Sequence, residues 1–320
     1  MSNLKTAESV SPKHPDKICD FISDSILDAL VEQDKNSRVA IETMGGHNEV
    51  KVTGEVTTNA KIDYKKIVQS IVGRGYKIDV NIVEQSREIG QSVDVGGAGD
   101  QGIMVGYACN DNNDLIPQEL YLARDLCKFI YNVNQNDGKT QITLNKKNEI
   151  EVCVCSFCGI KKTELTKLVN QWLKKQKTNN KITIHVNPSG EWFIGGFDAD
   201  AGVTGRKLIV DNYGPQVCIG GGAFSGKDIT KVDRSGAYAA RRIAVDILNK
   251  EKAKEVIVKL AYAIGVVEPV MIDVMVDSKQ FNFTNSISVE SIKKDILKNK
   301  FLFSETSEWG AFGNGFCWDN

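Results

Sequence analysis

The chain reads HPDKICDFISDSILDALVEQDKNSRVAIETMGGHNEVKVTGEVT over residues 14–57, and this stretch contains the alternation that decides the fold. Over 16–33, apolar residues recur every three or four positions behind a proline, which predicts an amphipathic helix. The β-branched segments 39–43 and 50–57 follow and predict two strands. One helix beside two successive strands favours α+β layers over a doubly wound parallel sheet.

Similar signals continue along the rest of the chain. A second long helix is expected over about 233–250, and it opens with Asp233-Arg234 as the first opens with Asp16-Lys17, which is consistent with an internal repeat. Shorter segments predict helices at 64–72, 117–131, 162–175 and 289–297, and strands at 142–144, 150–157, 182–186, 256–263 and 270–276.

The composition is that of a folded globular protein. The chain has 320 residues, of which 41% are hydrophobic and 25% charged, so intrinsic disorder is excluded. This length predicts two or three units, or one large domain built of repeats. Lysine and arginine number 40 against 41 acidic residues, so we expect no nucleic-acid binding through phosphate contacts alone.

Location and redox state follow from the apolar segments and the cysteines. The polar N-terminal segment resembles no export signal, and the apolar stretch 256–276 carries Lys259, Glu268 and Asp273, which are costly in a bilayer. We therefore expect a cytoplasmic protein without a membrane span. The eight cysteines are too dilute for a disulfide scaffold, so we expect reduced thiols, with buried side chains at Cys19, Cys109, Cys127 and Cys218.

The most unusual local sequence is GGGAFSGKD at 220–228. From Gly221 it fits the first seven places of the P-loop pattern, but Asp228 stands where that pattern needs a hydroxyl for magnesium. The glycines can still bring backbone amides close to an anion, with Lys227 and Lys231 as charge partners. The segment therefore predicts phosphate handling without a P-loop, and the alternative is a glycine-rich turn.

Three further motifs have two readings each. GAGDQG at 97–102 fits a dinucleotide fingerprint, but the β-like residues after it exclude that site and leave a functional loop carrying Asp100. His14-Pro15-Asp16-Lys17 indicates either an anion site or a capped helix start. The loop DADAGVTGRK at 198–207, before the strand-like residues 208–210, can hold a metal, an ammonium or a phosphate, or form a plain turn.

Cys155 and Cys158 have no second pair at zinc spacing, so no zinc site is expected.

Taken in order, the motifs HPDK, GAGDQG, TGRK at 204–207, GGGAFSGKD and KVDRSGAYAAR at 231–241 resemble S-adenosylmethionine synthetase, also called methionine adenosyltransferase. The resemblance covers nearly the whole chain. It implies three similar β/α subdomains in a pseudo-threefold arrangement, which we place at 1–95, 96–195 and 196–320. It also implies a homodimer with shared active sites, with a tetramer as a further possibility.

The implied reaction is attack of the methionine sulfur on C5′ of the ATP ribose. Triphosphate leaves intact and is then hydrolysed to phosphate and pyrophosphate. Because a thioether has no proton to lose, no general base is needed, and catalysis consists of alignment and neutralisation of an anionic leaving group. The implied cofactors are two Mg²⁺ ions and K⁺.

The matching motifs imply roles for individual residues. The catalytic set is His14, Lys17, Lys139, Arg206 and Lys227. Within it, His14 would donate to the oxygen at C5′, and Lys17 would face the triphosphate. The ATP contacts are His14, Asp137, Lys139, Trp192, Asp200, Arg206, Lys207, Ala223 and Lys227, and the methionine contacts are Glu55, Gln91, Asp200 and Lys231. Asp16 and Asp233 would bind magnesium and Glu42 potassium, and Asp100 is a further candidate.

The chain departs from the family pattern at two places. Residues 91–96 stand where the family has a longer loop over the site, so we expect weaker gating of the ligands. Glu191-Trp192 stands where Arg-Phe is usual beside the adenine; Trp192 can still stack on the base, but Glu191 reverses a charge. Two other functions remain open: a P-loop-type ATPase or kinase, and a non-catalytic nucleotide-binding regulator.

Overall fold

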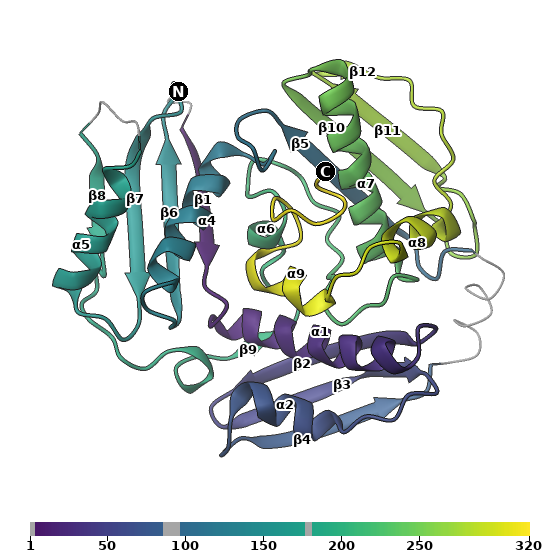
Figure 1. The fold of residues 1–320 in the computed structure, drawn as a ribbon, viewed down its shortest axis with the longest axis horizontal. Coiled ribbons are helices and arrows are strands. Elements are labelled where there is room, and N and C mark those ends of the chain that lie inside the picture. The colour runs from purple at the N-terminus through teal and green to yellow at the C-terminus, as the bar shows by residue number, and fades with distance from the viewer. Residues whose placement is uncertain (1–3, 86–96, 177–180) are drawn as a thin grey trace.

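The computed structural model describes residues 4–85, 97–176 and 181–320. In this part, three four-stranded sheets surround a shared centre, and helices cover the inner face of each sheet (Figure 1). The first third of the chain forms β1 (Lys5–Val10), α1 (Pro15–Gln33), β2 (Arg38–Gly46), β3 (Glu49–Thr57), α2 (Tyr64–Val72) and β4 (Lys77–Val83).

The other two thirds follow a related order. The middle of the chain forms β5 (Gly102–Cys109), α4 (Gln118–Tyr131), β6 (Gly138–Leu144), β7 (Ile150–Phe157), α5 (Lys162–Leu173) and β8 (Thr183–Val186). The last part forms η1 (Gly196–Asp198), β9 (Gly202–Val203), α6 (Leu208–Asp211), α7 (Val232–Glu251), β10 (Glu255–Tyr262), β11 (Met271–Val276), β12 (Lys279–Gln280), α8 (Val289–Leu297) and α9 (Phe303–Trp309).

Each third of the chain gives its first strand to the sheet of another third. The sheet orders are β9-β2-β3-β4, β1-β6-β7-β8 and β5-β10-β11-β12, and in each the donated strand pairs antiparallel with the first strand of a hairpin. This cyclic exchange repeats the same topology three times and confirms the expected α+β fold with three similar subdomains. The linear division at 95 and 195 stays a prediction, because the sheets combine strands from both sides of it.

Helix α1 forms because its first turn is capped and its inward face is apolar. Pro15 occupies the first turn, and the His14 side chain caps it by accepting from the Asp16 amide. Its inward residues Cys19, Ile22, Ile26 and Leu30 are fully buried in the shared core. Burial of each Ile or Leu contributes about 1.5–3 kcal/mol, so α1 is firmly fixed at the centre of the molecule.

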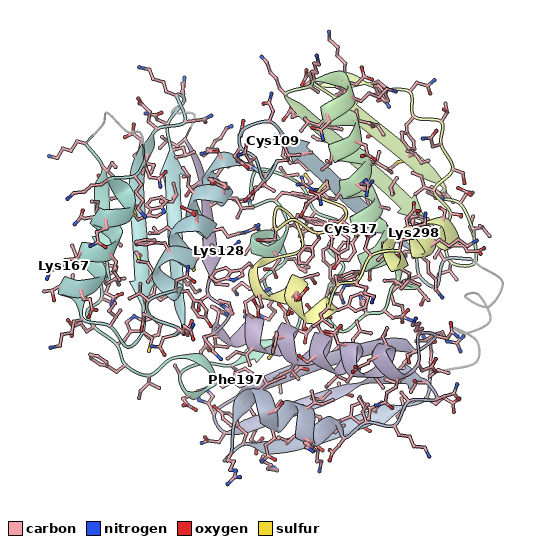
Figure 2. The ribbon with its side chains drawn as sticks, viewed as in Figure 1. Cys109, Lys128, Lys167, Phe197, Lys298 and Cys317 are labelled. Carbon is pink, nitrogen blue, oxygen red and sulfur yellow. The ribbon has the colours of Figure 1, made fainter. Side chains whose placement is uncertain are left out.

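The C-terminal segment ties the subdomains together. From α4, Arg124 donates to the Phe312 carbonyl at 2.6 Å. Lys128, which is labelled in Figure 2, donates to the Asn314 side chain at 2.8 Å. From α7, Arg241 pairs with Asp319 at 2.9 Å. The segment after α9 therefore contacts both α4, from the middle of the chain, and α7, from its last third.

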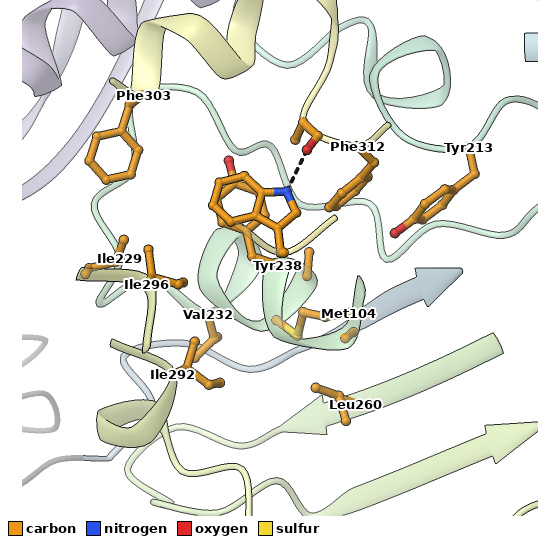
Figure 3. Close-up of a cluster of buried hydrophobic side chains, with 14 of the residues drawn as sticks. Met104, Tyr213, Ile229, Val232, Tyr238, Leu260, Ile292, Ile296, Phe303 and Phe312 are labelled. Atoms are coloured by element: carbon orange, nitrogen blue, oxygen red, sulfur yellow. Dashed lines mark hydrogen bonds between the residues drawn. The ribbon is translucent and has the colours of Figure 1, made fainter. Parts of the chain in front are cut away.

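Aromatic side chains fill the core beneath this segment. Tyr238 stacks on Trp318 with ring centroids 3.8 Å apart, and Tyr213 stacks on Phe312 at 4.8 Å (Figure 3). The indole of Trp318 donates to the Ala311 carbonyl at 2.7 Å, which satisfies its buried N–H. Around these rings lie Val232, Leu260 and Met104, from α7, β10 and β5.

Most predicted elements occur where they were expected, with two corrections. Residues 208–210, predicted as strand-like, form the short helix α6. Cys218 is exposed rather than buried, although all eight cysteines are free thiols as predicted. In the described part of the chain, no helix combines the length and apolarity needed to cross a bilayer.

Candidate active site

The edge of strand β2 brings together two motifs that lie far from it in sequence. Near the end of β2, Met44 and Gly45 pair with Val203 and Gly202 of β9. Near its start, the Ile41 amide donates to the Gly226 carbonyl at 3.0 Å, and the Val39 amide donates to the Asp228 carboxylate at 2.7 Å. The TGRK and GGGAFSGKD segments therefore lie one after the other along the same strand edge.

The two segments also touch each other. Gly205 has a φ of +77°, and a Cβ there would lie 2.5 Å from the Cβ of Ala223. A larger residue at Gly205 would push the segments apart, so this glycine is required both by its backbone conformation and by the close approach.

His14, Asp16, Arg206 and Lys207 form a first group, which we call the His14 group. The Lys207 ammonium lies 2.6 Å from one Asp16 oxygen, and the Arg206 guanidinium lies 3.9 Å from the other. The second oxygen also accepts from the Val203 amide at 2.9 Å, which fixes the carboxylate at the edge of β9. Lysine, arginine and imidazole thus gather at the N-terminus of α1, whose free amides also favour anions.

His14 is held as a neutral imidazole whose proton lies on Nε2. Burial is the largest cause that lowers its pKa to about 3, and the nearby Lys207 and Lys139 ammonium groups add to this effect while Asp16 and Asp200 oppose it. Its Nδ1 accepts from the Asp16 amide at 3.1 Å, so in the neutral ring the proton is on Nε2. His14 can therefore donate a hydrogen bond from Nε2 without carrying a charge.

Asp137, Lys139 and Asp200 lie beside the His14 group. Burial raises the pKa of Asp137, while the Gly196 amide, which donates to it at 3.0 Å, and Lys139 lower it. Asp200 accepts from the adjacent Ala201 amide at 2.8 Å and is exposed. These positions, predicted as ATP contacts, are therefore close in space although 63 residues separate Asp137 from Asp200.

Lys227, Asp233 and Glu42 form a second group, which we call the Lys227 group. The Lys227 ammonium lies 2.6 Å from Asp233 at the start of α7. Burial raises the pKa of the Glu42 carboxyl, and Lys227 opposes that rise. Gly222 packs against Asp233 so closely that a Cβ would lie 2.3 Å from its carboxyl carbon, which explains part of the glycine run.

The P-loop alternative is wrong on structural grounds. A P-loop needs a strand that ends before Gly221 and a helix that begins near Lys227. Instead, residues 217–226 belong to neither strand nor helix, and α7 begins at Val232. The dinucleotide fingerprint is likewise excluded, because residues 97–102 lead into β5 and not into a helix.

The residues predicted to hold methionine are not joined to one another. Lys231 pairs with Asp228 at 3.3 Å, Glu55 lies on β3 opposite Ala40, and Asp200 lies near His14. No hydrogen bond or ion pair connects these three described residues. Gln91 lies outside the described residues, as does the shortened segment 91–96. Asp100 is exposed and accepts from the adjacent Gln101 amide at 2.8 Å.

The structure differs from the expectation for Lys17. Its side chain is only 2% exposed, and its ammonium lies 2.6 Å from Asp211 and 3.3 Å from Asp20. Burial lowers its pKa, but the two carboxylates outweigh burial and raise the pKa above the ordinary value. Contact with a phosphate would require breaking both ion pairs. In this structure Lys17 therefore holds the two carboxylates and does not face the site.

The reversed charge at Glu191 is used by a neighbouring helix. Its carboxylate accepts from the Lys162 amide at 2.8 Å at the N-terminus of α5, where the capping residue Lys161 offers no acceptor. The next residue, Trp192, accepts from the Gly159 amide at 2.9 Å through its carbonyl. Glu191 therefore anchors the segment that carries Trp192.

Replacing Glu191 with alanine is expected to lower the free energy of unfolding by about 0.5–1 kcal/mol, because it removes the acceptor and the negative charge from the start of α5. Chemical denaturation followed by circular dichroism measures this loss. Glu191→Gln keeps an acceptor oxygen and should lose less. Equal stability of Glu191→Ala and the parent would contradict the capping role.

A cavity of about 810 Å³ opens on another side of α1. Phe21, Val72, Tyr131 and Phe193 line it, and of the predicted site residues that the structure describes it reaches only Asp137 and Lys17. The His14 and Lys227 groups lie outside it, so this cavity is not the place where the predicted site residues converge.

Sequence reasoning missed a stripe of carboxylates on α1. Asp16, Asp20, Asp24 and Asp28 recur every fourth residue, and each accepts a backbone amide from a distant segment. The regular spacing was visible in the sequence, since residues four apart share one face of a helix.

Sequence comparison assigns the chain to a known family. The S-adenosylmethionine synthetase N-terminal, central and C-terminal domains match residues 2–95, 95–192 and 194–320. The chain belongs to the S-adenosylmethionine synthetase family. This confirms the resemblance drawn from the motifs, and the three domains together cover nearly all of the chain.

Named relatives and a solved structure agree with this assignment. The S-adenosylmethionine synthase of Prochlorococcus marinus is 38% identical over 92% of this chain and 84% of its own length, and that of Mesoplasma florum is 36% identical over 100% and 97%. A solved structure, described as an unusual S-adenosylmethionine synthetase from Campylobacter jejuni, is 33% identical, covers 99% of this chain and 96% of its own, and has a TM-score of 0.88.

Proposed function

We propose that this chain forms S-adenosylmethionine from ATP and L-methionine and hydrolyses the triphosphate to phosphate and pyrophosphate. The observation that carries the proposal is the alignment of the His14 and Lys227 groups along one strand edge, each with a basic side chain against a carboxylate at a helix start. Family membership supplies the reaction, and the two groups supply the charge that a triphosphate leaving group requires.

The basic side chains of the site are proposed to act on the triphosphate. Arg206, Lys207 and Lys227 bind and orient the phosphates, and Lys139 joins them from β6. Their positive charge matters most as the C5′–O bond breaks and negative charge grows on the leaving triphosphate. The Nε2–H of His14 donates to the leaving oxygen. Trp192 and Asp137 hold the adenosine, with Asp200 and Ala223 in the same binding set.

Methionine is proposed to bind through opposite charges. Glu55 and Asp200 would receive its ammonium and Lys231 its carboxylate, with Gln91 as a further contact. The thioether then needs only alignment with C5′, because sulfur attacks without losing a proton. The supporting observation is the position of Lys231 at the start of α7, two residues before Asp233.

Asp16 and Asp233 fit the proposed role of magnesium ligands. Each carboxylate holds a lysine ammonium at 2.6 Å, so each position already accommodates a cation. Among the residues that the structure describes, no three or more His, Cys, Asp or Glu side chains gather around one point, so these carboxylates would each supply one ligand, and water and substrate phosphate would supply others. When bound, Mg²⁺ neutralises the triphosphate, and K⁺ is proposed to bind at Glu42.

We expect Asp16→Asn and Asp233→Asn each to raise the magnesium concentration needed for half-maximal activity severalfold, because an amide lacks the charge that attracts the ion. Titration of Mg²⁺ at saturating ATP measures this. Asp295→Asn, an exposed carboxylate paired with Lys298, is the matched control. Identical half-saturation in all three variants would remove Asp16 and Asp233 from the metal site.

A cytoplasmic homodimer with shared active sites is also proposed. The outer face of the β5-β10-β11 sheet, opposite α7, carries Ile103, Ala261 and Met271 in one row, with Ile103 54% and Met271 41% exposed. A second copy would cover such an apolar row. Met44 on β2 is likewise 54% exposed.

The deciding experiment is incubation with ATP, methionine, Mg²⁺ and K⁺, followed by mass detection of S-adenosylmethionine. Two reactions serve as controls: one lacks methionine, and the other contains an ATP analogue whose adenosyl group cannot be transferred. Nucleotide binding without product would instead identify the non-catalytic regulator. The ratio of triphosphate to phosphate released in the same reaction tests the predicted weaker gating.

A further inference from the structure

Two of the carboxylates of α1 accept from the backbone amides that directly precede basic residues of the site. Asp20 accepts from the Gly205 amide at 2.8 Å, and Arg206 follows directly. Asp24 accepts from the Gly226 amide at 2.8 Å, and Lys227 follows directly. The same helix thus holds the residue before a key cation in both the His14 group and the Lys227 group.

Both glycines are fixed in place from other sides as well. Their φ angles are +77° at Gly205 and +80° at Gly226, so each marks a sharp change of chain direction. A Cβ at Gly205 would meet Ala223, and one at Gly226 would lie 2.0 Å from the Ile41 carbonyl oxygen. Neither glycine has room to shift toward these neighbours, so the close contacts on one side and the hydrogen bond to α1 on the other together determine where the next side chain starts.

Asp20 also reaches the far end of the segment that carries Arg206 and Lys207. Its second oxygen lies 3.3 Å from the Lys17 ammonium, which contacts Asp211 at 2.6 Å at the end of α6. Arg206 and Lys207 therefore lie between two fixed residues, Gly205 and Asp211. Asp20 holds Gly205 and Lys17 holds Asp211, and these two α1 residues form a buried ion pair. Asp20 is 1% exposed and lies beneath the segment, away from solvent.

We propose that Asp20 is a positioning residue for adenosyl transfer: it fixes Arg206 and Lys207 against the departing triphosphate through Gly205 and Lys17. This inference rests on the proposed function, since it assigns the triphosphate to these two basic residues. Asp20 touches no substrate. It acts by placement, and displacement of a catalytic group by about 1 Å can cost a hundredfold in rate.

Asp28 provides a matched control on the same stripe of the same helix. Its carboxylate accepts from the Phe303 amide at 2.7 Å and the Ser304 amide at 3.0 Å, where α9 begins, and no predicted site residue follows. Asp20→Ala and Asp28→Ala remove the same chemical group and the same type of hydrogen bond. Only Asp20→Ala frees a segment of the site.

The test compares these two variants in the full-length protein. Calorimetry measures binding of imidotriphosphate, a non-hydrolysable analogue of triphosphate, with Mg²⁺, and steady-state kinetics gives kcat and the KM for methionine. For Asp20→Ala we expect triphosphate affinity and kcat each to fall about tenfold or more, with the KM for methionine unchanged. For Asp28→Ala we expect a lower unfolding temperature with unchanged triphosphate affinity and kcat.

Isosteric variants keep the test decisive if the alanine variants fold poorly. Asp20→Asn keeps an acceptor for the Gly205 amide, and we expect its triphosphate affinity to lie between those of the parent and Asp20→Ala. Asp28→Asn should match the parent in that assay. Equal losses in the Asp20 and Asp28 variants, or none in either, would overturn the inference. A parent protein that makes no S-adenosylmethionine would instead overturn the proposed function.

Discussion

Asp24→Asn is expected to lower the free energy of unfolding by about 3–5 kcal/mol, because it leaves a buried guanidinium without its counter-charge. Arg234 and Asp24 are both fully buried and form two parallel hydrogen bonds of 2.7 and 2.9 Å. The Arg234 guanidinium also lies 4.5 Å from the Phe303 ring centroid, in the core that Figure 3 shows. The Arg234 and Asp24 side chains are both 0% exposed, so bulk water does not solvate the guanidinium. Denaturation in urea, followed by circular dichroism, measures the loss.

An exposed ion pair supplies the control for Asp24. Arg242 and Asp246 lie four residues apart on α7, with side chains 50% and 59% exposed, and are 3.3 Å apart. Asp246→Asn should change the free energy of unfolding by less than about 1 kcal/mol, since exposed pairs are solvated with or without a partner. If the two variants lost equal stability, the buried pair would not be the link between α1 and α7 that its geometry indicates.

The regular elements were predictable where one periodic pattern persisted over several turns. The helix at 16–33 and the strands at 150–157 and 50–57 were found because their apolar residues face a single core. Strand β4, Lys77–Val83, was missed although Ile78, Val80 and Ile82 alternate, because its half-buried face carries a weaker signal. Strand β1 is shorter and more polar, and it is stabilised by pairing with β6, which is distant in sequence.

Helix α6 shows how tertiary contacts override local preference. Leu208, Ile209 and Val210 favour a strand by composition, yet they form one helical turn. The turn places Asp211 against the buried Lys17 ammonium. An ion pair between residues 194 positions apart leaves no local signal, so the prediction from composition was wrong.

The candidate site was predictable by residue type but not by arrangement. Glycines, lysines and acids in short motifs indicated phosphate chemistry at 14–17, 204–207 and 220–228. That β2 would gather the last two along its edge depends on the strand exchange, which no local pattern encodes. The same holds for Lys17, whose place in HPDK suggested a phosphate contact and whose buried carboxylate partners come from two different segments.

Lys227→Met is expected to reduce kcat by a factor on the order of 10²–10³, or about 2.7–4 kcal/mol of transition-state stabilisation. The side chain of Lys227 is 19% exposed and lies in the group formed with Asp233 and Glu42. Its charge is proposed to act chiefly on the triphosphate as the C5′–O bond breaks, so removing it should affect the transition state far more than bound methionine. Steady-state rates at saturating ATP, with methionine varied, measure kcat and KM separately.

Lys298→Met makes the same chemical change at a surface position and tests whether the loss belongs to the site. Lys298, labelled in Figure 2, also contacts a carboxylate, Asp295 at 2.8 Å, but its side chain is 72% exposed. It should leave kcat unchanged, because a solvated charge contributes little to any one geometry. Parental kcat in Lys227→Met would remove Lys227 from the reaction. A higher KM for methionine with unchanged kcat would instead show that Lys227 binds methionine. The roles proposed for Lys227 and Lys231 would then have to be exchanged.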